Sequence, residues 1–289
     1  MPQITDLWIT IASAVVINRT MHVFEAAIQP YVYKFAKKKP SETEDMLLFK
    51  SKKASHNVFM SIWHTFSTVG LLYCIQGKTW TPSYMLGLGT GSFINGFPNM
   101  PFSPMDNDGY LFGLIILGHP VQQTFFHFLK ERNPDFAEMS FHHLAHVSLA
   151  SCYLFTNMIP VGSLVALCHE FNDIFVQLSK VFHLTNHGAP AIFSVLTAQA
   201  GWFYGRLYCL PLIIGEIYHG LHYAPERAHL QPYISFSILF LSALVVLHSY
   251  WFCLFQILNY RVLSKGSTDV PDIQNDVTKL KRPQREKEL

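Results

Sequence analysis

Long apolar runs alternate with short polar or charged segments along most of the sequence. Runs of this kind are long enough to cross a bilayer as helices, because about 20 mainly apolar residues span its hydrocarbon core. Five of them lie at about residues 4–35, 55–75, 110–129, 189–218 and 233–258, and two more lie within 142–180. The pattern therefore predicts an all-α integral membrane protein with about seven transmembrane helices.

The segments between the runs divide the chain into a membrane domain and its flanking parts. Residues 36–53 are rich in lysine and predict an exposed, basic, cytosolic connector between an N-terminal transmembrane helix (1–35) and a domain of about six helices (54–262). Within that domain, residues 82–104 are rich in Gly, Pro, Asn and Ser, which is typical of an irregular or re-entrant segment. Residues 263–289 are polar and charged, as expected of a solvated cytosolic tail.

The distribution of basic residues orients this topology. Lysine and arginine gather after the first, third, fifth and seventh runs, and these four places fall on one side of a seven-helix protein. Loops that face the cytosol carry an excess of Lys and Arg, so we expect that side to be cytosolic. His142 and His143 then lie at the cytosolic mouth of the fourth span.

The overall composition agrees with a membrane protein. Hydrophobic residues make up 50% of the 289 residues, charged residues make up 14%, and the mean hydropathy is +0.21. The formal net charge of +2 gives no electrostatic reason to expect a nucleic-acid partner. All five cysteines lie inside apolar runs, which predicts buried free thiols.

Two stripes of polar residues interrupt the apolar runs between residues 142 and 180. Residues three or four apart share one face of a helix, and the stripes follow that spacing: His143, His146, Ala150, Tyr153 and Asn157 on one run, and Gly162, Ala166, His169, Asp173, Gln177 and Lys180 on the next. An Asp at the centre of a membrane helix costs about 2.5 to 3.5 kcal/mol unless it faces a partner or a watery cavity. The two stripes therefore predict one shared chamber that opens towards the cytosol.

The histidines suggest acid–base or nucleophilic chemistry in that chamber. An imidazole can act as a general base, a nucleophile or a metal ligand, and a nearby carboxylate can orient it. His169 and Asp173 can pair directly, or each can meet the His142 and His143 pair; a packing role for any single histidine is the simpler alternative. The near-match of residues 169–173 to HExxH lacks its second histidine, and HHxxH at 142–146 lacks the further histidine boxes of di-iron enzymes. We therefore predict no metal site.

The stretch 142–180 resembles, without gaps, the signature of the TLC domain as found in ceramide synthases, HHxxxxxLxxxSxxxNxxRxGxLxxxxHDxSDxxLExxK. The residues that match it are His142, His143, Leu149, Asn157, Gly162, Leu164, His169, Asp173 and Lys180. The likeness continues upstream in NRTMHVFEAAIQP and ERNPDFAEMSFHH, and downstream at Arg206, Leu207, Pro211, Trp251, Lys265, Gly266 and Asp269. It thus covers most of the chain.

This resemblance implies a seven-span enzyme of the endoplasmic reticulum that condenses a sphingoid long-chain base with a fatty acyl-CoA to form ceramide or dihydroceramide. Its catalytic residues are expected to be His142, His143, His169 and Asp173, supported by Glu170, Asn157, Lys180 and Arg206. Acyl-CoA is expected as a co-substrate, with no bound cofactor. The expected partners are membrane lipid, the base and acyl-CoA; a homo-oligomer and a membrane-complex subunit both remain open.

Four departures from the signature motivate a different function. Where the family has Arg, Asp, Ser and Glu, this chain has Pro160, Glu170, Phe171 and Gln177. The alternative is a TLC-fold protein without catalytic activity, acting as a lipid-binding or structural subunit of a larger membrane complex, for instance in the mitochondrial inner membrane. The chamber separates the two hypotheses, because an enzyme needs its polar groups to converge on a cavity that admits a chain.

Overall fold

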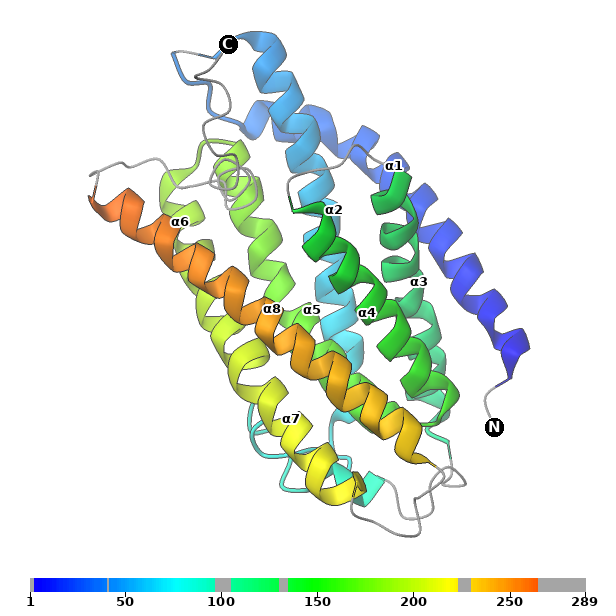
Figure 1. Cartoon of the computed structure of the whole chain (residues 1–289). Helices are drawn as coiled ribbons and strands as arrows, with labels where there is room; N and C mark the ends of the chain where they lie inside the picture. Colours follow the sequence, from blue (N-terminus) through cyan, green and yellow to red (C-terminus); the bar gives the residue numbers. More distant parts are fainter. Residues whose placement is uncertain (1–2, 41, 97–104, 130–134, 223–229, 265–289) are drawn as a thin grey trace, which may run out of the picture.

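The computed structural model describes residues 3–40, 42–96, 105–129, 135–222 and 230–264, and within these ranges the regular structure is entirely helical. The helices lie side by side in one elongated bundle (Figure 1). Their bounds are α1 Leu7–Phe35, α2 Glu44–Ile75, α3 Asn107–Leu129, α4 Phe136–Phe155, α5 Ile159–Leu184, α6 Gly188–Trp202, α7 Leu210–Glu216 and α8 Gln231–Ser264. Two short 3₁₀ helices, η1 (Ile4–Asp6) and η2 (Phe93–Gly96), complete the α-type and 3₁₀ elements.

The predicted sixth span is one helical path with two wide turns. Helix α6 continues through the π-helix η3 (Phe203–Cys209), α7 and the π-helix η4 (Ile217–His222). Counted as one path, these elements bring the described helical crossings to the seven predicted from the hydropathy pattern. Four helices, α1, α2, α5 and α8 as far as Ile257, are long and apolar enough to cross a membrane by themselves. The predicted all-α membrane fold is therefore confirmed.

The start of α2 shortens the segment predicted as a connector. The helix begins at Glu44, inside residues 36–53, because the Thr43 hydroxyl accepts a hydrogen bond from Met46 N at 3.2 Å. An N-cap of this kind and acidic residues in the first turn both favour a helix start. Hydrogen bonds also hold the connector against the turn after α5. The buried carboxylate of Glu42 accepts them from Lys39 N and Asn186 Nδ2, both at 3.0 Å.

The remaining connections agree with the sequence wherever they are described. Residues 76–96 form turns and the short η2, as the Gly- and Pro-rich composition predicted. Residues 97–104, the basic residues Lys130 and Arg132, and the tail from Lys265 onwards lie outside the described residues.

Helix α5 occupies the centre of the bundle. It packs along α2 on one side and α6 on another, and it also contacts α3, α4 and α7. By contrast, α1 and α8 expose large apolar side chains, including Trp8 and Val23 on α1 and Leu239 and Val246 on α8. Such faces suit lipid contact in a protein whose helices satisfy their backbone hydrogen bonds internally. Functional side chains on α5 are therefore shielded from lipid by its neighbours.

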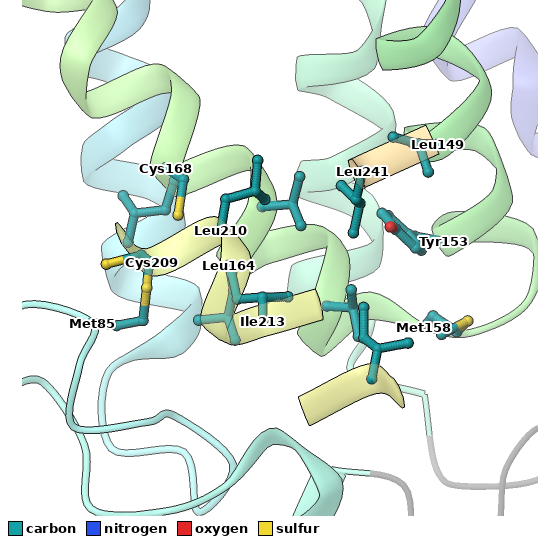
Figure 2. Close-up of a cluster of buried hydrophobic side chains, with 14 of the residues drawn as sticks. Met85, Leu149, Tyr153, Met158, Leu164, Cys168, Cys209, Leu210, Ile213 and Leu241 are labelled. Carbon is teal, nitrogen blue, oxygen red and sulfur yellow. The ribbon is translucent and has the colours of Figure 1, made fainter. Parts of the chain in front are cut away.

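The main apolar cluster lies next to the polar residues of the same helices. Figure 2 shows ten of its labelled side chains, which come from α4, α5, η3, α7, α8 and the irregular segment: Met85, Leu149, Tyr153, Met158, Leu164, Cys168, Cys209, Leu210, Ile213 and Leu241. His146 lies three residues before Leu149 on α4, His169 follows Cys168 on α5, and His248 lies seven residues after Leu241 on α8. The apolar cluster thus fixes the relative positions of the three helices that carry these histidines.

Candidate active site

Three histidines from three helices meet inside the bundle. The Nε2 atoms of His169 on α5 and His248 on α8 lie 3.0 Å apart, and both side chains are buried. The ring of His142 on α4 has its centroid 5.7 Å from that of His248 and 6.3 Å from that of His169. We call His142, His169 and His248 the histidine cluster.

The hydrogen bonds of the cluster fix its protonation pattern. His169 Nδ1 lies 2.7 Å from the carbonyl oxygen of Val165, so Nδ1 must carry the hydrogen. A neutral His169 then has a bare Nε2, which accepts the Nε2–H of His248 and leaves the Nδ1 of His248 bare. That nitrogen and the Nδ1 of His142 are both buried without a hydrogen-bond partner. Buried polar atoms rarely lack partners, so these two nitrogens are available to a substrate group or a proton.

An ion pair and an indole hold the cluster from the side of η3. Arg206 Nη2 donates to Asp173 Oδ1 at 2.5 Å and to the carbonyl oxygen of His169 at 3.3 Å. The guanidinium lies 3.9 Å over the ring of Trp202, whose Nε1 donates to the backbone carbonyl of His248 at 3.2 Å. Arg206 and Trp202 thereby tie the backbones of α5 and α8 together beside the histidines.

Three of the predicted site residues lie apart from this arrangement. His143 turns towards α3, where its ring centroid is 5.0 Å from that of His127. Helix α4 ends at Phe155, so Asn157 does not continue the helical stripe; it occupies the following turn with φ 59°, a left-handed conformation that Asn tolerates. Lys180 lies seven residues beyond Asp173 on α5, about 10 Å along the axis.

Glu170 belongs to a second polar group on the other side of α5. Its Oε2 atom lies 2.8 Å from Nδ1 of His64 on α2, and both side chains are buried. The ring of His64 meets that of His119 on α3 edge-on at 5.7 Å. Asp173 and Glu170, close together in the sequence, therefore serve different partners.

A cavity of about 60 Å³ lies between α2, α3, α4 and α5, with His146 and Glu170 in its wall. The ring centroid of His146 is 6.1 Å from that of His169 and 6.2 Å from that of His142, so the cavity adjoins the histidine cluster. The rest of its wall is almost entirely apolar: Leu71, Cys74, Gly109, Phe112, Gly113, Ile116, Leu117, Pro120, Ala150, Tyr153, Leu154, Ile159, Gly162, Ser163 and Ala166. Stripe residues such as His146, Tyr153 and Gly162 line this cavity but His169 and Asp173 do not, so it corresponds to only part of the predicted chamber. An opening towards the cytosol stays a prediction, and a long acyl chain fits only if side chains of the wall move.

Several residues of the site were missed from the sequence. His248 and Trp202 come from spans in which no polar stripe was recognised, and His64 lies in the second span, where none was recognised either. The signal was available, because an ionisable residue inside a membrane helix points to a functional or paired position by itself. Among the described residues, no three His, Cys, Asp or Glu side chains are placed to hold a metal ion.

The comparison with known proteins identifies the family. The model of the TLC domain matches residues 53–256. The chain belongs to the TLC-domain family. It is accordingly a multi-pass membrane protein.

Relatives within the family are ceramide synthases from animals and plants. Ceramide synthase hyl-2 of Caenorhabditis elegans is 25% identical over 304 residues, covering 99% of this chain and 88% of that protein. Ceramide synthase 4 of Mus musculus is 26% identical over 234 residues, covering 78% of this chain and 55% of that protein. Ceramide synthase LOH2 of Arabidopsis thaliana is 28% identical over 154 residues, which are 51% of each protein. The match to the mouse and plant proteins thus spans about half of their length.

Proposed function

We propose that this protein is a ceramide synthase-like N-acyltransferase, which transfers a fatty acyl group from acyl-CoA to the amine of a sphingoid long-chain base. The observation that carries the proposal is the histidine cluster, with two unpartnered ring nitrogens, next to His146 in the wall of a mainly apolar cavity. Relatives named ceramide synthases over nearly the whole chain support the choice of reaction.

The reaction requires one proton acceptor and a route for the leaving thiolate. The amine nitrogen attacks the thioester carbonyl, the new C–N bond forms, the C–S bond breaks, and the amine proton passes through a base to the departing CoA thiolate. The unpartnered Nδ1 of His142 suits this base, or alternatively a transient acyl carrier, in the tautomer that leaves it without a hydrogen, since a neutral imidazole serves either role. In this scheme His169 and His248 orient one another, and Asp173 and Arg206 hold them in position.

The position of the cluster suits a substrate that is polar at one end. His142 lies six residues from the start of α4, about 9 Å along the helix, at the end of the bundle predicted to face the cytosol. The CoA group can then remain at the membrane surface while the acyl chain enters between the helices. Acyl-CoA acts as a co-substrate in this proposal, with the endoplasmic reticulum membrane as the site of action.

A second candidate function is a lipid-binding or structural subunit without catalysis, in a larger complex such as one of the mitochondrial inner membrane. The small cavity favours it, because about 60 Å³ admits no long chain without movement of the wall. Two departures from the family signature are also accommodated structurally. Pro160 stands in the first turn of α5, where proline fits, and Phe171 packs against Phe175 and the main apolar cluster.

The test is ceramide formation by the purified protein in detergent, given sphinganine and a panel of acyl-CoAs and followed by mass spectrometry. Turnover that His142→Ala and Asp173→Ala both abolish supports the N-acyltransferase. No turnover with any acyl-CoA from a folded protein, with Glu170→Asp also inactive, rejects it and favours the structural subunit.

A further inference from the structure

The buried pair Glu170 and His64 is the one carboxylate–imidazole contact between α2 and α5 that borders the cavity, among the described residues. The side chains are 10% and 7% exposed, and the Oε2 to Nδ1 distance is 2.8 Å. A carboxylate at this depth needs compensation, because burying an unpaired charge is costly. His64 supplies one hydrogen bond to one of the two carboxylate oxygens.

The carboxylate keeps the capacity to bind a further donor. An ionised carboxylate is an acceptor with two oxygens and about four lone-pair sites, and it donates nothing. His64 occupies Oε2, while Glu170 itself forms part of the cavity wall. A ligand that approaches through the cavity therefore meets a fixed hydrogen-bond acceptor with negative charge in otherwise apolar surroundings.

The chemistry of this wall selects the ligand. A negatively charged acceptor in a medium of low dielectric attracts a cationic donor much more strongly than a neutral one. The surrounding wall of Leu71, Phe112, Ile116 and Leu117 is apolar and accepts hydrocarbon once these side chains move apart, because the cavity of about 60 Å³ is smaller than a long chain. A molecule that satisfies both parts has a primary ammonium group at the end of a long alkyl chain.

The location also fits the proposed reaction. His146 shares the cavity wall with Glu170, and its ring centroid is 6.2 Å from that of His142. An amine held at Glu170 thus lies one histidine ring away from the histidine cluster. Glu170, one methylene longer than the aspartate of the family signature, is also long enough to reach across to His64 on α2.

We propose that Glu170, held in place by His64, is a recognition site for the primary amine of a long-chain substrate. Glu170 contacts the ammonium group directly, and His64 is a positioning residue that orients the carboxylate. The inference rests on the proposed N-acyltransferase function only in naming the sphingoid base as the natural ligand; amine binding itself requires no catalysis.

The test compares hexadecylamine with hexadecanol, two ligands with the same chain and different head groups. The protein is placed in zwitterionic lipid nanodiscs, and its unfolding temperature is followed against ligand mole fraction to give an apparent Kd, because a ligand that binds the folded state raises that temperature. For the unchanged protein we expect the amine to bind about tenfold or more tightly than the alcohol, as one hydrogen bond to a charged group provides. Glu170→Gln, which keeps the shape and removes the charge, should abolish that preference.

His64 variants separate positioning from bulk structure. His64→Asn retains an N–H near the position of Nδ1 and should keep most of the preference for the amine, whereas His64→Phe should lose most of it. If Glu170→Gln does not fold, His64→Phe carries the test, because it leaves the carboxylate and removes only its anchor.

The chain offers a matched control pair on the same helix. His56 Nδ1 lies 2.7 Å from Glu25 Oε1, between α2 and α1 and away from the cavity. Glu25→Gln should leave the preference for the amine intact. An equal loss in Glu25→Gln and Glu170→Gln, or an unchanged preference in Glu170→Gln, would overturn the inference.

The outcomes for binding and for catalysis are distinguishable. If the preference for the amine depends on Glu170 but no acyl transfer occurs, the binding site is supported and the N-acyltransferase function is rejected. If acyl transfer occurs, Glu170→Gln should raise KM for sphinganine about tenfold and change KM for acyl-CoA less than twofold. If acyl transfer occurs and Glu170→Gln changes neither KM value, the N-acyltransferase function is supported and the binding site is rejected.

Discussion

His169 and His248 share a hydrogen bond of 3.0 Å between their Nε2 atoms although they lie 79 residues apart in the sequence. This bond connects the central helix α5 to the last helix α8. It also sets which nitrogen of each ring carries a hydrogen, because His169 Nδ1 is committed to the Val165 carbonyl. His248 is therefore part of the same unit as the residues of the family signature.

We expect His248→Phe to lower acyl transfer about a hundredfold, the scale of losing a positioned acid–base group. Phenylalanine fills the space but cannot donate to His169 Nε2. His248→Gln offers an amide N–H near the position of Nε2 and should recover part of the rate. Initial rates of ceramide formation check this, with His127→Gln on α3 as a control outside the cluster. Equal rates for the unchanged protein and His248→Phe would show that His248 has no role in the reaction.

Loss of Arg206 should destabilise the fold. Arg206→Met leaves the Asp173 carboxylate without its partner, and we expect the free energy of unfolding to fall by about 3 kcal/mol. This value is at the low end for a broken buried ion pair, because 26% of the Asp173 side chain is exposed. The double variant Arg206→Met/Asp173→Asn removes both charges and should be more stable than Arg206→Met alone. Unfolding in mild detergent measures both, and a double variant less stable than either single one would contradict the ion-pair argument.

Glu42 should make stability depend on pH at the end of the bundle that is predicted to face the cytosol. Burial by itself raises the pKa of this carboxyl, but hydrogen bonds from Lys39 N, Lys50 and Asn186 outweigh it and lower the pKa below its usual value. A carboxyl whose pKa is lower in the folded state stabilises the protein above its unfolded pKa of about 4.3, and that stability is lost as pH falls through the folded value.

We therefore expect the unfolding midpoint to fall on acidification below about pH 4 to 5, and to fall less in Glu42→Gln. At neutral pH this variant should be less stable by about 1 to 3 kcal/mol, since it loses charge-assisted hydrogen bonds. Asp45→Asn, an exposed carboxylate in the first turn of α2, is the control. If the unfolding midpoint falls on acidification equally in Glu42→Gln and in the unchanged protein, other groups cause the pH dependence.

The close contact of α1 with α3 depends on Gly118. A Cβ atom at this position would lie 2.7 Å from Ala14 N and 3.0 Å from the carbonyl oxygen of Thr10. Small residues allow membrane helices to approach in this way, so Gly118→Ala should force them apart and cost about 1 to 3 kcal/mol. Gly215→Ala on α7, where a Cβ meets nothing within 4 Å, should be neutral or stabilising in the same unfolding assay.

The sequence predicted those parts of the molecule that depend on local pattern. Hydropathy located the seven helical paths, and the spacing of polar residues placed His146 on α4 and His169 and Asp173 on α5 within one region. The partners of these residues could not be predicted, because contacts between distant helices leave no periodic signal. Arg206 pairs with Asp173 and His248 with His169 across 33 and 79 residues, and the first contact also depends on the wide turns of η3.

Direct pairing of His169 with Asp173, one of the two arrangements that the sequence left open, illustrates the limit. The two residues share a face of α5, yet each finds a nearer partner on another helix. Asn157 shows a second limit, since the helical stripe was extended two residues past the end of α4 at Phe155. Helix ends depend on turn conformation more than on the pattern of apolar positions.

His169 and Glu170 are neighbours in the chain but serve different helices, α8 and α2. Adjacent residues of an α-helix project about 100° apart around its axis, so the side chains of one turn of α5 can contact two separate groups of partners. A change at residue 170 can therefore alter what the cavity accepts while the contacts of His169 with α8 are inherited unchanged. Substrate preference and reaction chemistry can thus diverge independently among descendants of this protein.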